Sequence, residues 1–129
     1  MVVRSYADLE VWKKGVDLVL AVYRATGEFP RDEVFGLTSQ LRRAAVSIPS
    51  NVAEGQSRRS SAEFRRHLSI ALGSLAELET QLVIAEHLGY LDSDRHTALL
   101  AAANEVGRML SGLLRAITPT TRSSRGPSE

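Results

Sequence analysis

The 129-residue chain contains no cysteine, which excludes disulfide bridges, thiolate metal sites and a cysteine nucleophile. The same absence fits the reducing conditions of the cytosol, so we predict a cytoplasmic protein. No apolar run approaches the ~20 residues of a membrane-spanning helix. The N-terminal segment lacks the continuous apolar stretch of a signal peptide, so no membrane contact is expected. The formal net charge is only +1, so overall charge predicts no class of partner.

The length suits one compact domain, which we place at 1–118. A chain of this size buries enough surface to fold without covalent staples. Residues 119–129 are almost devoid of apolar side chains, and we predict a disordered tail there.

Four segments carry apolar residues at alternating steps of three and four, which is the spacing of one helical face. The predicted helices cover 6–27, 34–55, 61–88 and 92–118. Their inward faces are predicted to be Leu9, Trp12, Val16, Val19 and Tyr23; Leu37, Leu41, Ala44, Ile48 and Val52; Phe64, Leu68, Ala71, Leu75, Leu78, Leu82 and Ala85; and Leu99, Ala103, Val106, Leu110, Leu113 and Ile117. No segment alternates like a strand. The sequence therefore predicts an all-α protein, an antiparallel up-down-up-down four-helix bundle.

The helix ends carry recognisable signals. Ser60 and Glu63 have the spacing of a capping box at the third helix. Gly89 is placed to end that helix in a left-handed conformation. Asp92 or Ser93 can cap the fourth helix.

Several apolar residues fall outside the inward faces. They are Val11, Leu18, Leu20 and Val22 in the first helix, Ile70, Leu72, Val83 and Ile84 in the third, and Leu100, Met109 and Leu114 in the fourth. Such extra apolar positions favour a second contact surface, and hence self-association. The alternative is a generously packed monomeric core.

The stretch SIPSNVAEGQSRRS, at 47–60, contains a proline where the second helix should continue. Pro49 cannot donate to the Ala45 carbonyl, yet Ile48 and Val52 stay in phase with the preceding stripe. We therefore predict a kinked helix, with the kink at Pro49, Ser50 and Asn51, that ends at Gly55. A break and restart capped by Asn51 is the alternative. Neither a phosphate loop nor a GxSxG elbow fits the stretch.

Three motifs in this region are distinctive: LTSQLRRAAVSIPSN followed by AEG, GSL with ELETQL, and LGYL. Together with the upstream LEVWKKGVDLVLAVY, they make residues 6–91 similar to the 23S rRNA intervening sequence protein family. These are small bacterial four-helix bundle proteins, some encoded within insertions in large-subunit rRNA genes. The match continues more loosely through the fourth helix.

The resemblance implies a homopentamer of four-helix bundles in which no known catalytic residue carries over. It also implies a relation to the accessory variability proteins of diversity-generating retroelements, which bind a reverse transcriptase and nucleic acid. The EVGRML stretch of the fourth helix is similar to that branch.

Positive charge is concentrated in one part of the chain. Between Gln40 and His67 there are six arginines and two glutamates, a balance of +4. The arginines are Arg42, Arg43, Arg58, Arg59, Arg65 and Arg66. They are candidates for phosphate contact. The alternative is a solvated face with local salt bridges, for example from Glu63 to Arg66 or His67.

The kind of nucleic-acid contact is limited by what surrounds these arginines. Apart from Phe64, which is on the predicted core stripe, no aromatic residue is interleaved with them, which argues against base stacking. No helix-turn-helix, zinc finger or basic zipper is recognisable. Contact with RNA or DNA would therefore be electrostatic or shape-based.

No constellation for catalysis stands out. The three histidines do not form the ExxH pairs of a bundle di-iron site, so we predict no enzyme activity, no metal and no cofactor. The leading hypothesis is an oligomeric bundle that binds structured or ribosomal RNA or serves as a scaffold. The alternative is a protein-binding adaptor that docks an enzyme such as a reverse transcriptase, without binding nucleic acid itself.

Overall fold

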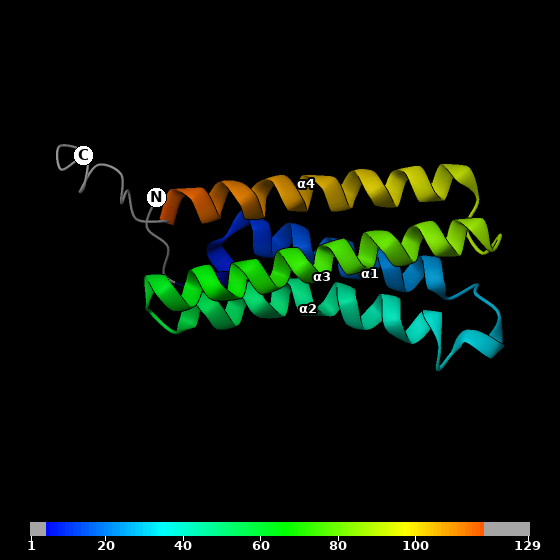
Figure 1. The fold of residues 1–129 in the computed structure, drawn as a ribbon, viewed down its shortest axis with the longest axis horizontal. Coiled ribbons are helices and arrows are strands. Elements are labelled where there is room, and N and C mark those ends of the chain that lie inside the picture. The colour runs from blue at the N-terminus through cyan, green and yellow to red at the C-terminus, as the bar shows by residue number, and fades with distance from the viewer. Residues whose placement is uncertain (1–4, 118–129) are drawn as a thin grey trace, which may run out of the picture.

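The computed structural model describes residues 5–117, which form four long α-helices lying side by side along one axis (Figure 1). The helices are α1 (Glu10–Thr26), α2 (Leu37–Ser57), α3 (Ser61–His87) and α4 (Ser93–Ile117). Two short 3-10 helices, η1 (Tyr6–Asp8) and η2 (Arg31–Glu33), precede α1 and α2. The segment predicted as one helix over 6–27 is therefore interrupted at Leu9, whose extended backbone separates η1 from α1. The tail predicted to be disordered lies outside the described residues.

Successive helices run in opposite directions, which confirms the predicted up-down-up-down bundle (Figure 1). Each helix packs on its two neighbours: α2 on α1 and α3, and α4 on α3 and α1. The pairs α1–α3 and α2–α4 are diagonal and share no backbone contact. Within residues 5–117 there is no β-strand.

Three of the four predicted inward faces are confirmed. The predicted stripe residues of α2 are all buried, as are those of α3 after Phe64 and those of α4 up to Leu110. Phe64, Leu113 and Ile117 pack against this core while remaining partly exposed. These stripes meet in one continuous core between the helices.

The predicted inward face of α1 is confirmed only in part: Leu9, Trp12 and Val19 pack against the core while partly exposed. Its buried residues are Val11, Gly15, Leu18, Val22 and Thr26, whereas Tyr23 from the predicted stripe is 43% exposed. The reason is Gly15. A Cβ atom there would lie 3.3 Å from the Pro49 Cβ of α2, so α1 turns its smallest residue toward α2, and the flanking Val11, Leu18 and Val22 are buried with it.

The ends of α3 and α4 use the predicted residues. The Ser60 Oγ accepts a hydrogen bond from the Glu63 amide at 3.3 Å, and Gly89 has a φ of 82°, the left-handed conformation that a glycine adopts without cost. At α4, the Asp92 carboxylate accepts from the Arg95 amide at 2.7 Å, so Asp92 is the capping residue of the two alternatives.

The predicted end of the second helix at Gly55 is wrong, because α2 continues to Ser57 and buries Gly55 against α3. A Cβ at Gly55 would lie 2.6 Å from the His67 Cβ. The glycine therefore serves close helix packing there, and the turn to α3 comes three residues later.

The outer face of α3 is partly apolar. Ile70, Val83 and Ile84 are 39–45% exposed, on the helix whose other faces pack against α2 and α4. Because α3 is apolar on several sides, it is the one described helix that meets the length and composition criterion for crossing a membrane. The core helices of soluble proteins meet the same criterion. The extra apolar positions predicted from the sequence are thus partly at the surface.

Candidate nucleic-acid interface

The turn between α2 and α3 presents two of the six predicted arginines. Arg58 and Arg59 are both exposed there. The Arg58 guanidinium donates to the Glu54 carboxylate at 2.9 Å, and this hydrogen bond holds the pKa of Glu54 below its ordinary value. Arg59 has a φ of 59°, a left-handed conformation that costs a non-glycine residue roughly 1–2 kcal/mol. Its guanidinium makes no ion pair or hydrogen bond with the other described residues, so it is available to a partner.

Arg65 and Arg66 follow in the first turns of α3 but face in different directions. The Arg66 guanidinium donates to the Glu63 carboxylate at 3.2 Å and lies 3.3 Å from the His67 Nε2. The local salt bridges predicted for Glu63 are therefore present. Arg65 instead donates to the Ile117 carbonyl at 3.3 Å, where it caps the C-terminal end of α4. Arg65 thus has a structural role, and Arg66 remains exposed.

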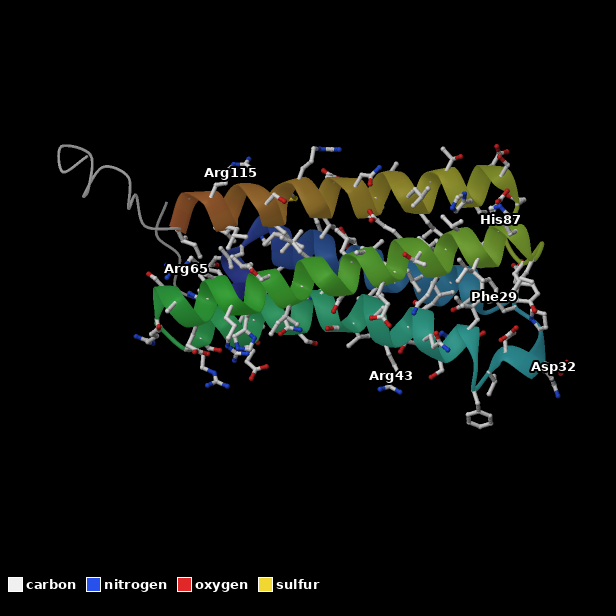
Figure 2. The ribbon with its side chains drawn as sticks, in the orientation of Figure 1. Phe29, Asp32, Arg43, Arg65, His87 and Arg115 are labelled. Atoms are coloured by element: carbon white, nitrogen blue, oxygen red, sulfur yellow. The ribbon has the colours of Figure 1, made fainter. Side chains whose placement is uncertain are left out.

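Arg42 and Arg43 do not belong to the same cluster. Arg42 lies across α1: its Nε donates to the Thr26 Oγ1 at 2.9 Å, and its guanidinium sits 4.4 Å from the centre of the Tyr23 ring. Arg43 is exposed, about midway along the bundle, and points away from it (Figure 2). No ion pair or hydrogen bond joins the Arg43 guanidinium to any residue within 5–117. Its distance from Arg58 along α2 is roughly 22 Å, at 1.5 Å per residue.

Two arginines on α4 were not predicted from the sequence. Arg108 and Arg115 are exposed and line a groove of about 520 Å³ between α3 and α4, together with Asn104 and Ser111. Neither arginine is paired with another described residue. Arg115 lies at the same end of the bundle as Arg65 (Figure 2). The sequence contains a pattern that could have predicted them. Positions 104, 108, 111 and 115 are polar and follow helical spacing, on the side of α4 opposite its apolar stripe.

Five exposed arginines lie at the end of the bundle where α2 and α4 end and α3 begins, or along the adjoining α3–α4 groove. We call this set the basic end: Arg58, Arg59, Arg66, Arg108 and Arg115. Three carboxylates lie beside it, from Glu54, Glu63 and Glu79. Five positive charges against three negative ones leave a surplus of two, smaller than the +4 counted along the sequence.

The predicted kink residues lie at the centre of α2, which is continuous through Pro49. The Pro49 ring is buried against Gly15, and Ser50 is exposed. Asn51 takes part in a polar network between α2 and α3. Its Nδ2 donates to the Ser47 carbonyl at 2.8 Å, and its Oδ1 lies 2.9 Å from the His67 Nδ1. Continuity of the helix excludes the break and restart, while the kink itself stays a prediction.

One further contact completes this network. The Ser47 Oγ is 2.8 Å from the Ser74 Oγ of α3. Because the Asn51 amide nitrogen already donates to Ser47, its oxygen accepts from His67, so the imidazole carries its proton on Nδ1. The network is partly buried, with His67 itself buried, and it holds α3 against α2 near the turn that carries Arg58 and Arg59.

The remaining titratable groups are dispersed. Among the described residues, no group of three or more histidine, aspartate or glutamate side chains is arranged to hold a metal ion. His87 lies at the opposite end from Arg65 (Figure 2), with its Nδ1 2.9 Å from the Val83 carbonyl.

Comparisons with known proteins agree with this fold. The family model described as 23S rRNA-intervening sequence protein matches residues 7–112. A crystal structure from Bacteroides thetaiotaomicron VPI-5482, described as a protein with unknown function from the S23 ribosomal protein family, is similar with a TM-score of 0.73 at 21% identity. The match covers 81% of this chain and 97% of that chain. No curated protein matches the chain.

Proposed function

The chain belongs to the 23S rRNA-intervening sequence protein family, and from that premise we propose that it is a non-enzymatic, self-associating, cytoplasmic bundle that binds the phosphate backbone of structured RNA. The observation that carries the proposal is the basic end, where Arg59, Arg108 and Arg115 have no acidic partner within residues 5–117. An unpaired guanidinium gives up no ion pair when it contacts a phosphate oxygen. Ribosomal RNA is the favoured partner because the family's description refers to 23S rRNA.

The chemistry of the basic end favours backbone contact over base recognition. Phe64 is the aromatic residue nearest in sequence to its arginines, and it packs against the core rather than being offered for stacking on a base. Arg58 and Arg66 would exchange their glutamate partners for phosphates. Binding of this kind depends steeply on salt, because each neutralised phosphate releases counterions.

Self-association would repeat the basic end and strengthen its field. The exposed apolar residues of α3 and the family resemblance both support an oligomer, and the resemblance gives a pentamer. The relation to retroelement accessory proteins stays a prediction.

The test is the affinity for a labelled RNA hairpin, and for duplex DNA of equal length, across a salt series. Two double variants remove charge from the basic end, Arg58→Gln with Arg59→Gln and Arg108→Gln with Arg115→Gln. A third, Arg31→Gln with Arg43→Gln, removes the same two charges elsewhere. We expect the first two to reduce the slope of log K against log salt by about one for each lost contact, and the third to leave it unchanged.

Equal behaviour of all three double variants would contradict the basic end as the binding surface. If the unmodified protein binds neither nucleic acid at low salt, the adaptor hypothesis becomes the better one, and a partner protein should be sought. Helicity and sedimentation of each variant serve as controls for folding and assembly.

A further inference from the structure

The corner between η2 and α2 carries the most exposed large apolar side chain in the described part of the chain. Phe35 is 97% exposed and its neighbour Val34 is 49% exposed. One exposed apolar residue needs no explanation. A fully exposed phenyl ring beside a second apolar residue, on a corner that is held rigid, is a stronger indication of a partner.

The rigidity comes from Glu33. One oxygen of its carboxylate accepts from the Leu37 amide at 2.9 Å, and the other accepts from the Tyr90 hydroxyl at 2.9 Å. The Gly36 amide also donates to the Glu33 carbonyl at 2.9 Å. These bonds fix the backbone on both sides of Phe35, so the corner holds its Cα in one position at the surface.

A groove of matching size lies between α1 and α4. It has a volume of about 240 Å³ and is lined by Ala21, Arg24, Ala25, Arg95, Ala98 and Leu99. The three alanines leave room that a larger side chain would fill. An apolar cavity of about 150 Å³ is sufficient to bind benzene in another protein, so this groove can accept a phenyl ring.

Phe35 cannot reach the α1–α4 groove of its own chain, but it can reach the groove of a second copy. The groove is formed by α1 and α4, whereas Phe35 precedes α2, the helix diagonal to α4. Both lie at the end of the bundle marked by Asp32 and Phe29 in Figure 2, since α1 ends, and α2 and α4 begin, at that end. When two copies lie side by side in the same orientation, Phe35 of one copy is therefore level with the groove of the other.

Charge on the two surfaces is complementary. Asp32, three residues before Phe35, is exposed and makes no salt bridge within the described residues. Arg24 on the groove is likewise exposed and unpaired there. A guanidinium beside the groove can also contact the face of an inserted ring.

From these observations we infer that Phe35 of one copy inserts into the α1–α4 groove of a second copy, with Asp32 beside Arg24. The inference rests on the self-association in the proposed function and names its contact. The two surfaces differ, so the contact is head-to-tail, and repeated copies close into a ring if the rotation permits.

The test uses sedimentation of the full chain and of two variants. Phe35→Ala removes the ring, and Ala98→Trp fills the groove. We expect each variant alone to sediment as a single chain. Mixed together, the intact groove of the first and the intact ring of the second form one contact, so the mixture should give a dimer and nothing larger. The far-ultraviolet dichroism of Phe35→Ala should be unchanged, because its side chain touches almost nothing.

A charge exchange gives an independent measurement in case Ala98→Trp fails to fold. Asp32→Arg alone and Arg24→Asp alone should each weaken self-association at least tenfold. The double variant should recover most of the loss, because the pair is restored with its signs reversed.

The outcomes separate this inference from the proposed function. If the unmodified protein is a single chain at all concentrations, self-association itself is wrong, while RNA binding is judged separately. If Phe35→Ala keeps the wild-type mass while Val83→Ser with Ile84→Ser dissociates, the contact lies on α3 and the inference is overturned. A mixture of two monomeric variants that does not form dimers overturns it as well.

Discussion

The interfaces of α2 with α3 and of α1 with α4 are built differently. At the first, Gly55 lies directly on the buried His67, and the half-buried Asn51 joins the two helices by hydrogen bonds. At the second, the polar contacts are exposed ion pairs, Lys14 with Glu105 at 3.8 Å and Arg95 with Glu28 at 3.0 Å. A groove lined by alanines opens between those two helices.

This difference separates the rigid part of the bundle from the part open to a partner. Buried and fully paired polar groups hold a single arrangement, because any shift leaves a donor or acceptor unsatisfied. Exposed ion pairs contribute little and are screened by salt. The α2–α3 interface is therefore suited to position the arginines of its turn, and the α1–α4 interface has space to receive a side chain from elsewhere.

The largest expected effect comes from enlarging one small side chain at each of the two interfaces. Gly55→Val should lower the free energy of unfolding by about 3 kcal/mol, because its Cβ would overlap the His67 Cβ and neither backbone can retreat. Ala98→Leu adds similar volume to the open groove and should change it by less than about 0.5 kcal/mol. Urea unfolding gives both values, measured in a Phe35→Ala background so that self-association does not contribute.

Equal losses in the two variants would show that the α1–α4 interface is as tightly packed as the α2–α3 interface. The comparison, and with it the argument for an open groove, would then be wrong.

Most of the fold could be predicted because three helices follow a simple rule. In α2, α3 and α4 the core is made by apolar residues at steps of three and four, and counting them finds the buried face. In α1 the contact with Pro49 is made by Gly15, which has no side chain to count. Gly55 was misread for the same reason, since a glycine in close packing and a glycine that ends a helix look alike in one sequence.

The candidate site was predicted less well, because the charge of a residue does not give the direction of its side chain. Arg42 and Arg65 differ from Arg43 and Arg66 by one position, about 100° around a helix. That rotation places Arg42 on Tyr23 and Arg65 on the end of α4. Arg115 was missed because it is far along the chain, and only the topology brings it to the same end.

A second, smaller effect is expected from the polar network. Asn51→Leu removes the acceptor of the His67 Nδ1–H and leaves that buried donor unpaired, which should cost about 2 kcal/mol of unfolding free energy. Ser74→Ala, the matched control, removes one of two partners of the Ser47 hydroxyl and should cost less than about 1 kcal/mol. A network that contributes to rigidity should also slow hydrogen exchange of amides around Ser47 in the wild type relative to Asn51→Leu.

If Asn51→Leu is as stable as the wild type, buried hydrogen bonds do not distinguish the two interfaces, and the contrast rests on packing alone.

The smallest expected effect concerns the corner that holds Phe35. Its contribution to the free energy of unfolding should fall at both acidic and alkaline pH. Hydrogen bonds from the Leu37 amide and the Tyr90 hydroxyl lower the pKa of Glu33 from its ordinary value of 4.5. The stabilisation is therefore complete above that value and is lost as the pH falls through the lower pKa of the folded state. The same bond raises the pKa of Tyr90 above 10.0, so its stabilisation is complete below pH 10 and is lost as the pH rises further.

Two variants separate these contributions. Glu33→Gln should reduce the unfolding free energy near neutral pH and approach the wild type at strongly acidic pH, where the wild-type carboxylate is protonated. Tyr90→Phe should keep the Leu37 cap and remove the alkaline dependence. Thermal unfolding at a series of pH values measures both. A constant difference between Glu33→Gln and the wild type from acid to neutral pH would mean that the ionised carboxylate does not hold the corner. Phe35 would then lie on a looser segment, and the open interface would lack the fixed aromatic side chain proposed to fill it.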